Sequence, residues 1–131
     1  MDNAKPLILV TDDDASIRNI LHIKLEAAGF RVSEATNGQE AIDFCKKEKP
    51  ALIVMDVGMP VMSGTETVTA IKKDDAIKDI QIIFLSNFGE ENELNAWLDQ
   101  KFAKELGAVD YMKKSEDISK IIEKITSLVH A

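Results

Sequence analysis

Apolar residues fall in short runs along the chain, separated by stretches in which they recur with helical spacing. Runs of this length, rich in β-branched residues, are typical of strands buried on both faces of a parallel sheet. The four runs are Leu7–Val10, Ala51–Met55, Ile80–Leu85 and Ala108–Met112. The segment Arg31–Ala35 alternates less regularly and is expected to form a strand at an edge. The pattern therefore predicts five strands.

An amphipathic stretch follows each expected strand. The first keeps helical spacing from Ile17 to Ala28, and Gly29 stands where a helix end favours a left-handed residue. The second opens with a variant capping box at Asn37–Glu40 and ends at Lys49–Pro50. The others are expected at about Thr65–Asp74, at Leu94–Leu106 and at Ile118–Val129. Alternating strands and helices predict one compact α/β domain with helices on both faces of a parallel sheet.

Composition narrows the classes of function. The 131 residues carry 16 basic and 23 acidic side chains, for a net charge of −7, so we expect no direct contact with nucleic acid. No apolar stretch approaches the ~20 residues that span a membrane. The charged segment Met1–Pro6 does not resemble a signal peptide, which favours a cytoplasmic protein. The single cysteine, Cys45, excludes an internal disulfide and is expected to be a small buried hydrophobe.

Acidic residues follow the first two strong runs directly. In an open parallel sheet the binding crevice lies beyond the carboxyl ends of the strands. Asp12, Asp13 and Asp14 follow the first run, and Asp56 follows the second. Asp14 is explained as the cap of the next helix. The other three should meet at one edge, where like charges repel, and Mg²⁺ is a cation that suits their oxygens.

A hydroxyl and an ammonium follow the remaining strong runs. Ser86 follows one run directly and Lys114 lies just beyond the other. Each residue alone is more typical of a turn or of a solvated charge. Together with the acids they form, in strand order, a set of groups suited to holding a phosphoryl group.

These motifs resemble the receiver domain of two-component response regulators, over essentially the whole chain. The matching segments are Val10–Asp14 through Arg18, Asp56–Gly64, Leu85–Asn87 and Tyr111–Lys114. The resemblance implies a flavodoxin-like three-layer sandwich, with a five-stranded parallel sheet of order 2-1-3-4-5 and helices on both faces. It also implies a single receiver domain over residues 1–131, without an output domain in this chain.

The resemblance further implies roles for the residues at the sheet edge. Asp56 would accept a phosphoryl group from the phosphohistidine of a sensor histidine kinase or phosphotransfer protein. Mg²⁺, with Mn²⁺ or Ca²⁺ as substitutes, would bind Asp13, Asp56 and the backbone carbonyl of Gly58, with Asp12 holding metal-bound water. Lys114 would pair with Asp56 before transfer and with the acyl phosphate afterwards.

A switch is implied in the second half of the chain. Ser86 would move to bind a phosphate oxygen, and Tyr111 would turn inward. Tyr111 is equally well explained as a half-buried strand aromatic with a wet hydroxyl. The fourth helix, fifth strand and fifth helix would then regulate a protein partner of a bacterial signalling pathway. The chain is expected to be a monomer or a phosphorylation-promoted homodimer, and no enzyme beyond its own phosphorylation and dephosphorylation.

Two features depart from the family pattern, the residue after Lys114 and the length of one segment. Ser115 replaces the usual proline, which leaves open whether the Lys114–Ser115 bond is cis or trans. We expect Ser115 to cap the final helix and Lys114 still to reach Asp56. The segment Ser86–Gly107 is longer than usual and contains Trp97, which would pack on the sheet or bind a partner. Phe88 would shield the site from water, whereas Gly58 would admit it.

Three other functions remain open at this point. A receiver-like module could bind partners without phosphorylation, although the complete set of site residues argues against it. A Mg²⁺-dependent phosphatase would place an acid two residues after Asp56, where this chain has Gly58. The chain could also be a receiver fragment cut from a longer DNA-binding response regulator.

Overall fold

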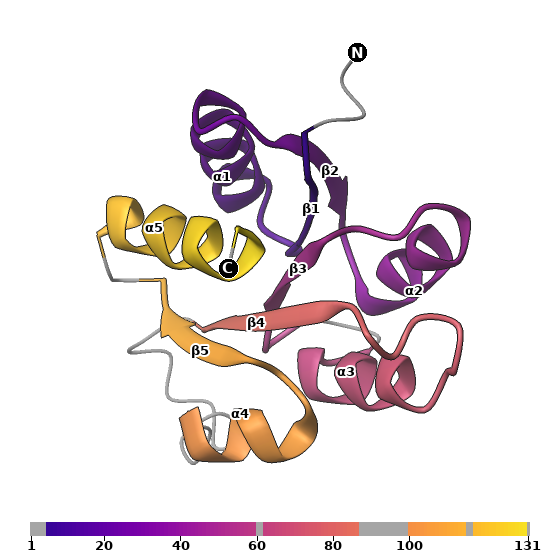
Figure 1. Ribbon diagram of the computed structural model, residues 1–131. Helices are drawn as coiled ribbons and strands as arrows, with labels where there is room; N and C mark the ends of the chain where they lie inside the picture. Colours follow the sequence, from indigo (N-terminus) through magenta and orange to yellow (C-terminus); the bar gives the residue numbers. More distant parts are fainter. Residues whose placement is uncertain (1–4, 60–61, 87–99, 115–116, 131) are drawn as a thin grey trace.

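The computed structural model describes residues 5–59, 62–86, 100–114 and 117–130, and there strands and helices alternate along the chain (Figure 1). The strands are β1 (Leu7–Thr11), β2 (Arg31–Ala35), β3 (Leu52–Asp56), β4 (Gln81–Ser86) and β5 (Asp110–Lys113). The helices are α1 (Ala15–Ala27), α2 (Gly38–Lys47), α3 (Gly64–Lys72), α4 (Gln100–Leu106) and α5 (Ile118–Val129). Every expected strand is present, and its ends lie within two residues of the prediction.

All five strands are parallel and lie in the order β2-β1-β3-β4-β5, as the resemblance implied. The expected edge strand, β2, lies at one edge, and β5 lies at the other. The register pairs Thr11 with Met55 and Ser86 with Lys113. The carboxyl ends of the strands therefore meet along one side of the sheet.

Apolar side chains form a separate core on each face of the sheet. Helices α1 and α5 cover one face, and α2, α3 and α4 cover the other (Figure 1). Successive strand residues point to opposite faces, so Ile8 lies in the α1–α5 core and Leu9 in the α2–α3 core, both fully buried. Cys45 is buried in the second core. Its complete burial confirms the expectation of a small buried hydrophobe, and burial raises the pKa of its thiol to about 11.

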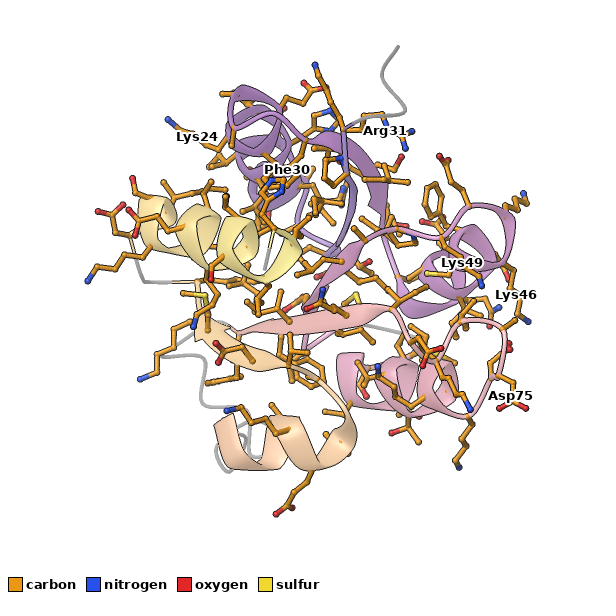
Figure 2. All side chains as sticks on the ribbon, in the orientation of Figure 1. Lys24, Phe30, Arg31, Lys46, Lys49 and Asp75 are labelled. Atoms are coloured by element: carbon orange, nitrogen blue, oxygen red, sulfur yellow. The ribbon has the colours of Figure 1, made fainter. Side chains whose placement is uncertain are left out.

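Many charged side chains lie on the periphery. Lys24, Lys46 and Asp75 extend away from the sheet into solvent, whereas Phe30 is buried and stacks on His130, with ring centroids 5.7 Å apart (Figure 2). Among the described helices, none is long and apolar enough to cross a membrane.

The helix ends show which short-range predictions were right. The Asp14 carboxylate caps α1 by accepting from the Ser16 N–H at 2.8 Å, and Gly29 adopts the expected left-handed conformation with φ of 98°. Asn37 caps α2 as predicted. The third helix ends at Lys72 rather than at Asp74.

The prediction that Ser115 caps the final helix was wrong. Helix α5 begins at Ile118, and the Asp117 carboxylate accepts from the Ser119 N–H at 3.0 Å. Both side chains are good caps, but the charge of an aspartate also interacts favourably with the positive end of the helix dipole. The predictions for Phe88, Trp97 and the Lys114–Ser115 bond lie outside the described residues.

Candidate functional site

The candidate site lies at the carboxyl ends of the four strands β1, β3, β4 and β5. Asp12 follows β1 directly, Asp56 is the last residue of β3, and Ser86 is the last residue of β4. Lys114 follows β5, and its backbone N–H donates to the Ser86 carbonyl at 2.6 Å. The parallel register thus brings together residues that are far apart in the sequence.

Lys114 is the centre of a buried ionic cluster. Its ammonium lies 2.7 Å from Asp12 Oδ2 and 3.1 Å from Asp56 Oδ1. Each of these three side chains is at most 7% exposed. The prediction that Lys114 reaches Asp56 is confirmed, but Asp12 is an equally direct partner, which the sequence did not indicate.

Burial and crowding change the acidity of the cluster. Burial, the nearby charge of Asp12 and the Asp13 side chain raise the pKa of Asp56, Lys114 opposes them, and the net result is a pKa of about 7. Burial lowers the pKa of Lys114, but its contacts with Asp12 and Asp56 outweigh burial and hold it above the usual value. One ammonium therefore only partly compensates the carboxylates, and the site attracts a further cation.

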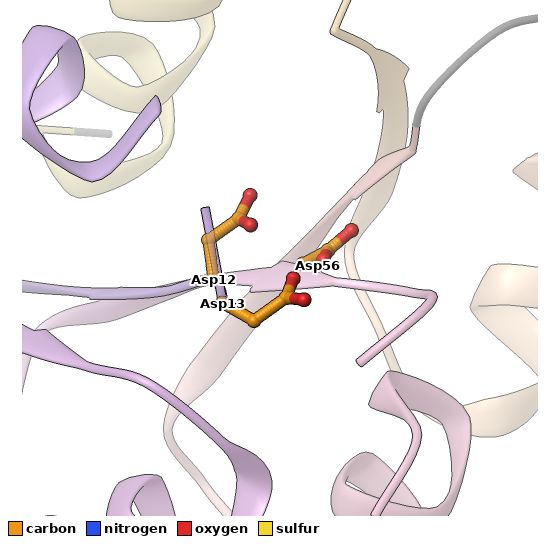
Figure 3. A group of neighbouring side chains, drawn as sticks. All are labelled: Asp12, Asp13 and Asp56. Carbon is orange, nitrogen blue, oxygen red and sulfur yellow. The ribbon is translucent and has the colours of Figure 1, made fainter. Parts of the chain in front are cut away.

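Asp13 completes a set of oxygen donors suited to a hard cation. Figure 3 shows Asp12, Asp13 and Asp56 beside one another, and one carboxylate oxygen from each lies within 4.8 Å of the others. Asp13 is exposed. Asp12 is already engaged, because Oδ1 accepts from the Asp14 N–H at 2.9 Å and Oδ2 contacts Lys114. A three-carboxylate oxygen set with an open side suits Mg²⁺, which receiver domains typically bind.

The loop after Asp56 is held close to α3. The Gly64 N–H donates to the Val57 carbonyl at 2.9 Å. A side chain on Gly64 would overlap the backbone carbonyl of Asp56, so only glycine permits this approach. Gly58, the expected backbone ligand, lies on the exposed part of the same loop.

Ser86 and Tyr111 lie on neighbouring strands, two steps apart in register. Ser86 is buried at the end of β4, and Tyr111 of β5 pairs with Phe84 of β4. Tyr111 is half-buried and packs against the α2–α3 core. The two residues are therefore linked by the backbone pairing of β4 with β5.

Two residues near the site were not found as functional candidates. The Arg18 Nη1 group donates to the backbone carbonyl of Asp12 at 2.8 Å, and its Nε contacts Glu34 Oε1 at 3.0 Å. Glu34 is near the end of β2, the neighbour of β1. The signal in the sequence was weak, since Arg18 was only the last residue of the matched segment and had no role assigned to it.

The family model for the response regulator receiver domain matches residues 8–126. A protein named "Probable transcriptional regulator ycf27" from Porphyra purpurea is 37% identical over 129 residues, covering 98% of this chain and 49% of its own length. The phosphate regulon transcriptional regulatory protein PhoB from Pseudomonas aeruginosa is 34% identical over 122 residues, covering 93% and 51%. The chain thus spans about half the length of these curated relatives.

Solved structures are similar over nearly the whole chain. The chemotaxis response regulator CheY4 of Vibrio cholerae superposes with a TM-score of 0.80 at 27% identity, covering 95% of this chain and 98% of that one. The receiver domain of the Francisella response regulator 1452 gives a TM-score of 0.82 at 25% identity, covering 96% and 98%. These likenesses and the family match agree with the geometry of the sheet edge. The chain is a member of the response regulator receiver domain family, whose proteins act in signalling and are not classical enzymes.

Proposed function

We propose that this chain is a phosphorylation-activated switch in which Asp56 accepts a phosphoryl group. The observation that carries the proposal is the buried contact of Lys114 with both Asp12 and Asp56, beside an exposed Asp13. It supports a role for Asp56 as the nucleophile, because an ammonium and a set of carboxylates suited to a cation lie beside it at one edge of the sheet. The donor would be the phosphohistidine of a sensor histidine kinase or phosphotransfer protein, the partner class with which receiver domains interact.

The chain's own residues would divide the work of the transfer. An Asp56 carboxylate oxygen forms the new bond to phosphorus as the bond from phosphorus to the histidine nitrogen breaks. Mg²⁺, when bound, supplies positive charge to the phosphoryl oxygens. Asp13, Asp56 and the Gly58 carbonyl would hold it directly and Asp12 through water. Because both oxygens of Asp12 are engaged, an indirect role suits this residue.

Lys114 and Ser86 would respond to the new group. The backbone of Lys114 is held by its hydrogen bond to the Ser86 carbonyl. The Lys114 ammonium would move its contact from Asp56 to a phosphoryl oxygen. The Ser86 hydroxyl would donate to another oxygen, and Tyr111 would turn further into the α2–α3 core. The surface of α4, β5 and α5 would carry this change to a protein target.

The names of the curated relatives suggest the kind of pathway. Proteins called transcriptional regulators extend to about twice the length that this chain matches. We place this chain in a signalling pathway of that kind, where the acidic surface acts through protein contacts. The alternative, a module that binds partners without phosphorylation, predicts no effect of phosphoryl donors.

The test exposes the chain to Mg²⁺ and acetyl phosphate, or to beryllofluoride, and follows the covalent mass and the spectra of α4, β5 and α5. We expect a phosphoryl adduct and a shift of that surface, both lost in Asp56→Asn. Asp110→Asn is the matched control, because it removes a buried aspartate at the other end of β5. Bound Mg²⁺ without adduct or shift would refute phosphorylation.

A further inference from the structure

Arg18 forms a bridge between three segments beside the site. Its Nη1 group donates to the Asp12 carbonyl at 2.8 Å in the loop between β1 and α1, and its Nε donates to Glu34 Oε1 at 3.0 Å in β2. The Arg18 side chain is only 15% exposed. Its planar, forked donors are therefore used in two directions at once, which a lysine could not reproduce.

Glu34 is itself fixed from both sides. One carboxylate oxygen contacts Arg18, and the other lies 2.7 Å from His22 Nδ1. A carboxylate only accepts hydrogen bonds, so His22 donates to it from Nδ1. Through its other ring nitrogen His22 lies 3.3 Å from Glu26. The chain of contacts leaves the Arg18 guanidinium little freedom to swing away.

The carbonyl that Arg18 holds belongs to the peptide unit between Asp12 and Asp13. The preceding peptide unit, between Thr11 and Asp12, is restrained as well, because the Asp12 N–H donates to the Ala35 carbonyl at 3.1 Å. The Asp14 N–H donates to Asp12 Oδ1 at 2.9 Å. Asp13, in contrast, is exposed, and the peptide that Arg18 contacts sets the direction in which the Asp13 side chain leaves the backbone.

We infer that Arg18, held by Glu34, is a positioning residue that orients the Asp12–Asp13 peptide and thereby presents Asp13 to a divalent cation. The inference rests on the proposed function in taking Asp13 as a cation ligand. Groups that orient metal ligands are typically worth about tenfold or more in metal affinity. Arg18 contacts a backbone carbonyl in this arrangement, so it fixes the ligand without occupying a carboxylate of the cluster.

The sign of the effect separates positioning from simple electrostatics. Arg18 is a positive charge near the cation site, so its removal should strengthen Mg²⁺ binding if only charge matters. If Arg18 positions Asp13, its removal should weaken binding instead. The two accounts therefore predict opposite changes in the same measured dissociation constant.

Arg31 provides a matched control. It also contacts a glutamate, with Nη1 3.1 Å from Glu48 Oε1, and it also donates to a backbone carbonyl, that of Lys5, at 3.2 Å. It begins β2, whereas Glu34 is near the end of that strand. Arg31 therefore makes the same kind of bridge at the amino end of β2, whereas the carboxylates lie at the carboxyl ends of the strands.

The experiment measures the Mg²⁺ dissociation constant by titration calorimetry and the free energy of unfolding in a chelator. Arg18→Met is expected to weaken Mg²⁺ binding about tenfold, Arg18→Lys by a smaller factor, and Arg31→Met not at all. The rate of phosphorylation by acetyl phosphate should approach that of the unaltered chain at saturating Mg²⁺. If Arg18→Met does not fold, the Mg²⁺ dissociation constants of Arg18→Lys and Arg31→Met are compared instead, and weaker binding by Arg18→Lys alone supports the inference.

The outcomes distinguish this inference from the proposed function. Unchanged or tighter Mg²⁺ binding by both Arg18 variants overturns the inference and leaves phosphorylation of Asp56 intact. Weaker binding by them, without any adduct on the unaltered chain, supports the positioning role and refutes the proposed function. Failure of the unaltered chain to bind Mg²⁺ overturns both.

Discussion

Lysine–aspartate contacts lie at both ends of β5, and they differ in the burial of the lysine and in the number of aspartates that it contacts. At the carboxyl end, Lys114 contacts Asp12 and Asp56. At the amino end, Asp110 contacts Lys124 of α5 at 3.0 Å. The side chain of Lys114 is 7% exposed and that of Lys124 is 42% exposed. One strand thus offers two environments for the same pair of functional groups.

The acidities of the two aspartates move in opposite directions. Burial and neighbouring carboxylates raise the pKa of Asp56 to about 7. Burial also acts to raise the pKa of Asp110, but the Tyr111 N–H, the Lys124 ammonium and the charge of Lys104 outweigh it and lower the pKa. The number of carboxylates per ammonium and the access of water therefore decide whether the pKa of the aspartate in such a contact is raised or lowered.

The largest effect is expected from Lys114→Met, which leaves Asp12 and Asp56 buried without their cation. Removing one partner of a buried ion pair typically costs about 3 to 5 kcal/mol. Protonation of Asp56 would remove part of that cost, so the loss of unfolding free energy should be greatest above neutral pH. Urea unfolding in a chelator measures it. A loss no larger than that of Lys124→Met would erase the distinction between the two ends of β5.

The dependence of stability on pH should show the next largest effect. The folded pKa of Asp56, about 7, lies above its ordinary value of 3.8. Its contribution to stability is therefore fully present below about pH 4 and is lost as the pH rises through 7. Between about pH 5 and pH 7 the loss amounts to about 3 kcal/mol, at about 1.4 kcal/mol per unit.

Asp56→Asn should remove that slope, and Asp110→Asn should not. Because the pKa of Asp110 is lowered, its contribution is present above the unfolded pKa and is lost as the pH falls. The two variants should therefore change the unfolding free energy with pH in opposite senses. Equal slopes for the unaltered chain and Asp56→Asn, measured by urea unfolding without metal, would contradict a raised pKa.

Much of this site could be predicted because it depends on strand ends. Once the apolar runs are assigned to parallel strands, Asp12, Asp56, Ser86 and Lys114 must reach one edge of the sheet. The buried runs specify the register strongly, since a slip of one residue would expose them. The prediction needed no knowledge of how any helix packs.

The contacts that were missed depend on helix packing and on local competition. Arg18 meets Glu34 only because α1 packs against β2. The spacing of apolar residues does not give the rotation of a helix relative to the strand beside it. Lys124 reaches Asp110 from α5 for the same reason. Ser115 and Asp117 are both good caps two residues apart, and the preference of the helix dipole for the aspartate is too small to decide between them without the path of the chain.

Magnesium should act on one end of β5 alone. A ligand that binds only the folded state stabilises it by about 2.7 kcal/mol at a hundredfold excess over its Kd. We expect thermal unfolding to shift upward with Mg²⁺ and to return when a chelator removes the metal. Asp13→Asn should abolish the shift, whereas Lys124→Met should retain it in full. A shift that survives in Asp13→Asn would place the cation elsewhere.

The smallest effect is expected from Lys124→Met. The lysine is 42% exposed, so solvent screens the contact, and pairs of this kind contribute at most about 1 kcal/mol. Asp110 keeps a hydrogen bond from the Tyr111 N–H at 2.8 Å, which limits the cost of losing the ammonium. Phosphorylation of Asp56 and Mg²⁺ affinity should be unchanged. Added salt should reduce the small stability difference further, and a salt-independent loss above about 2 kcal/mol would show that Lys124 supports the fold by packing rather than by charge.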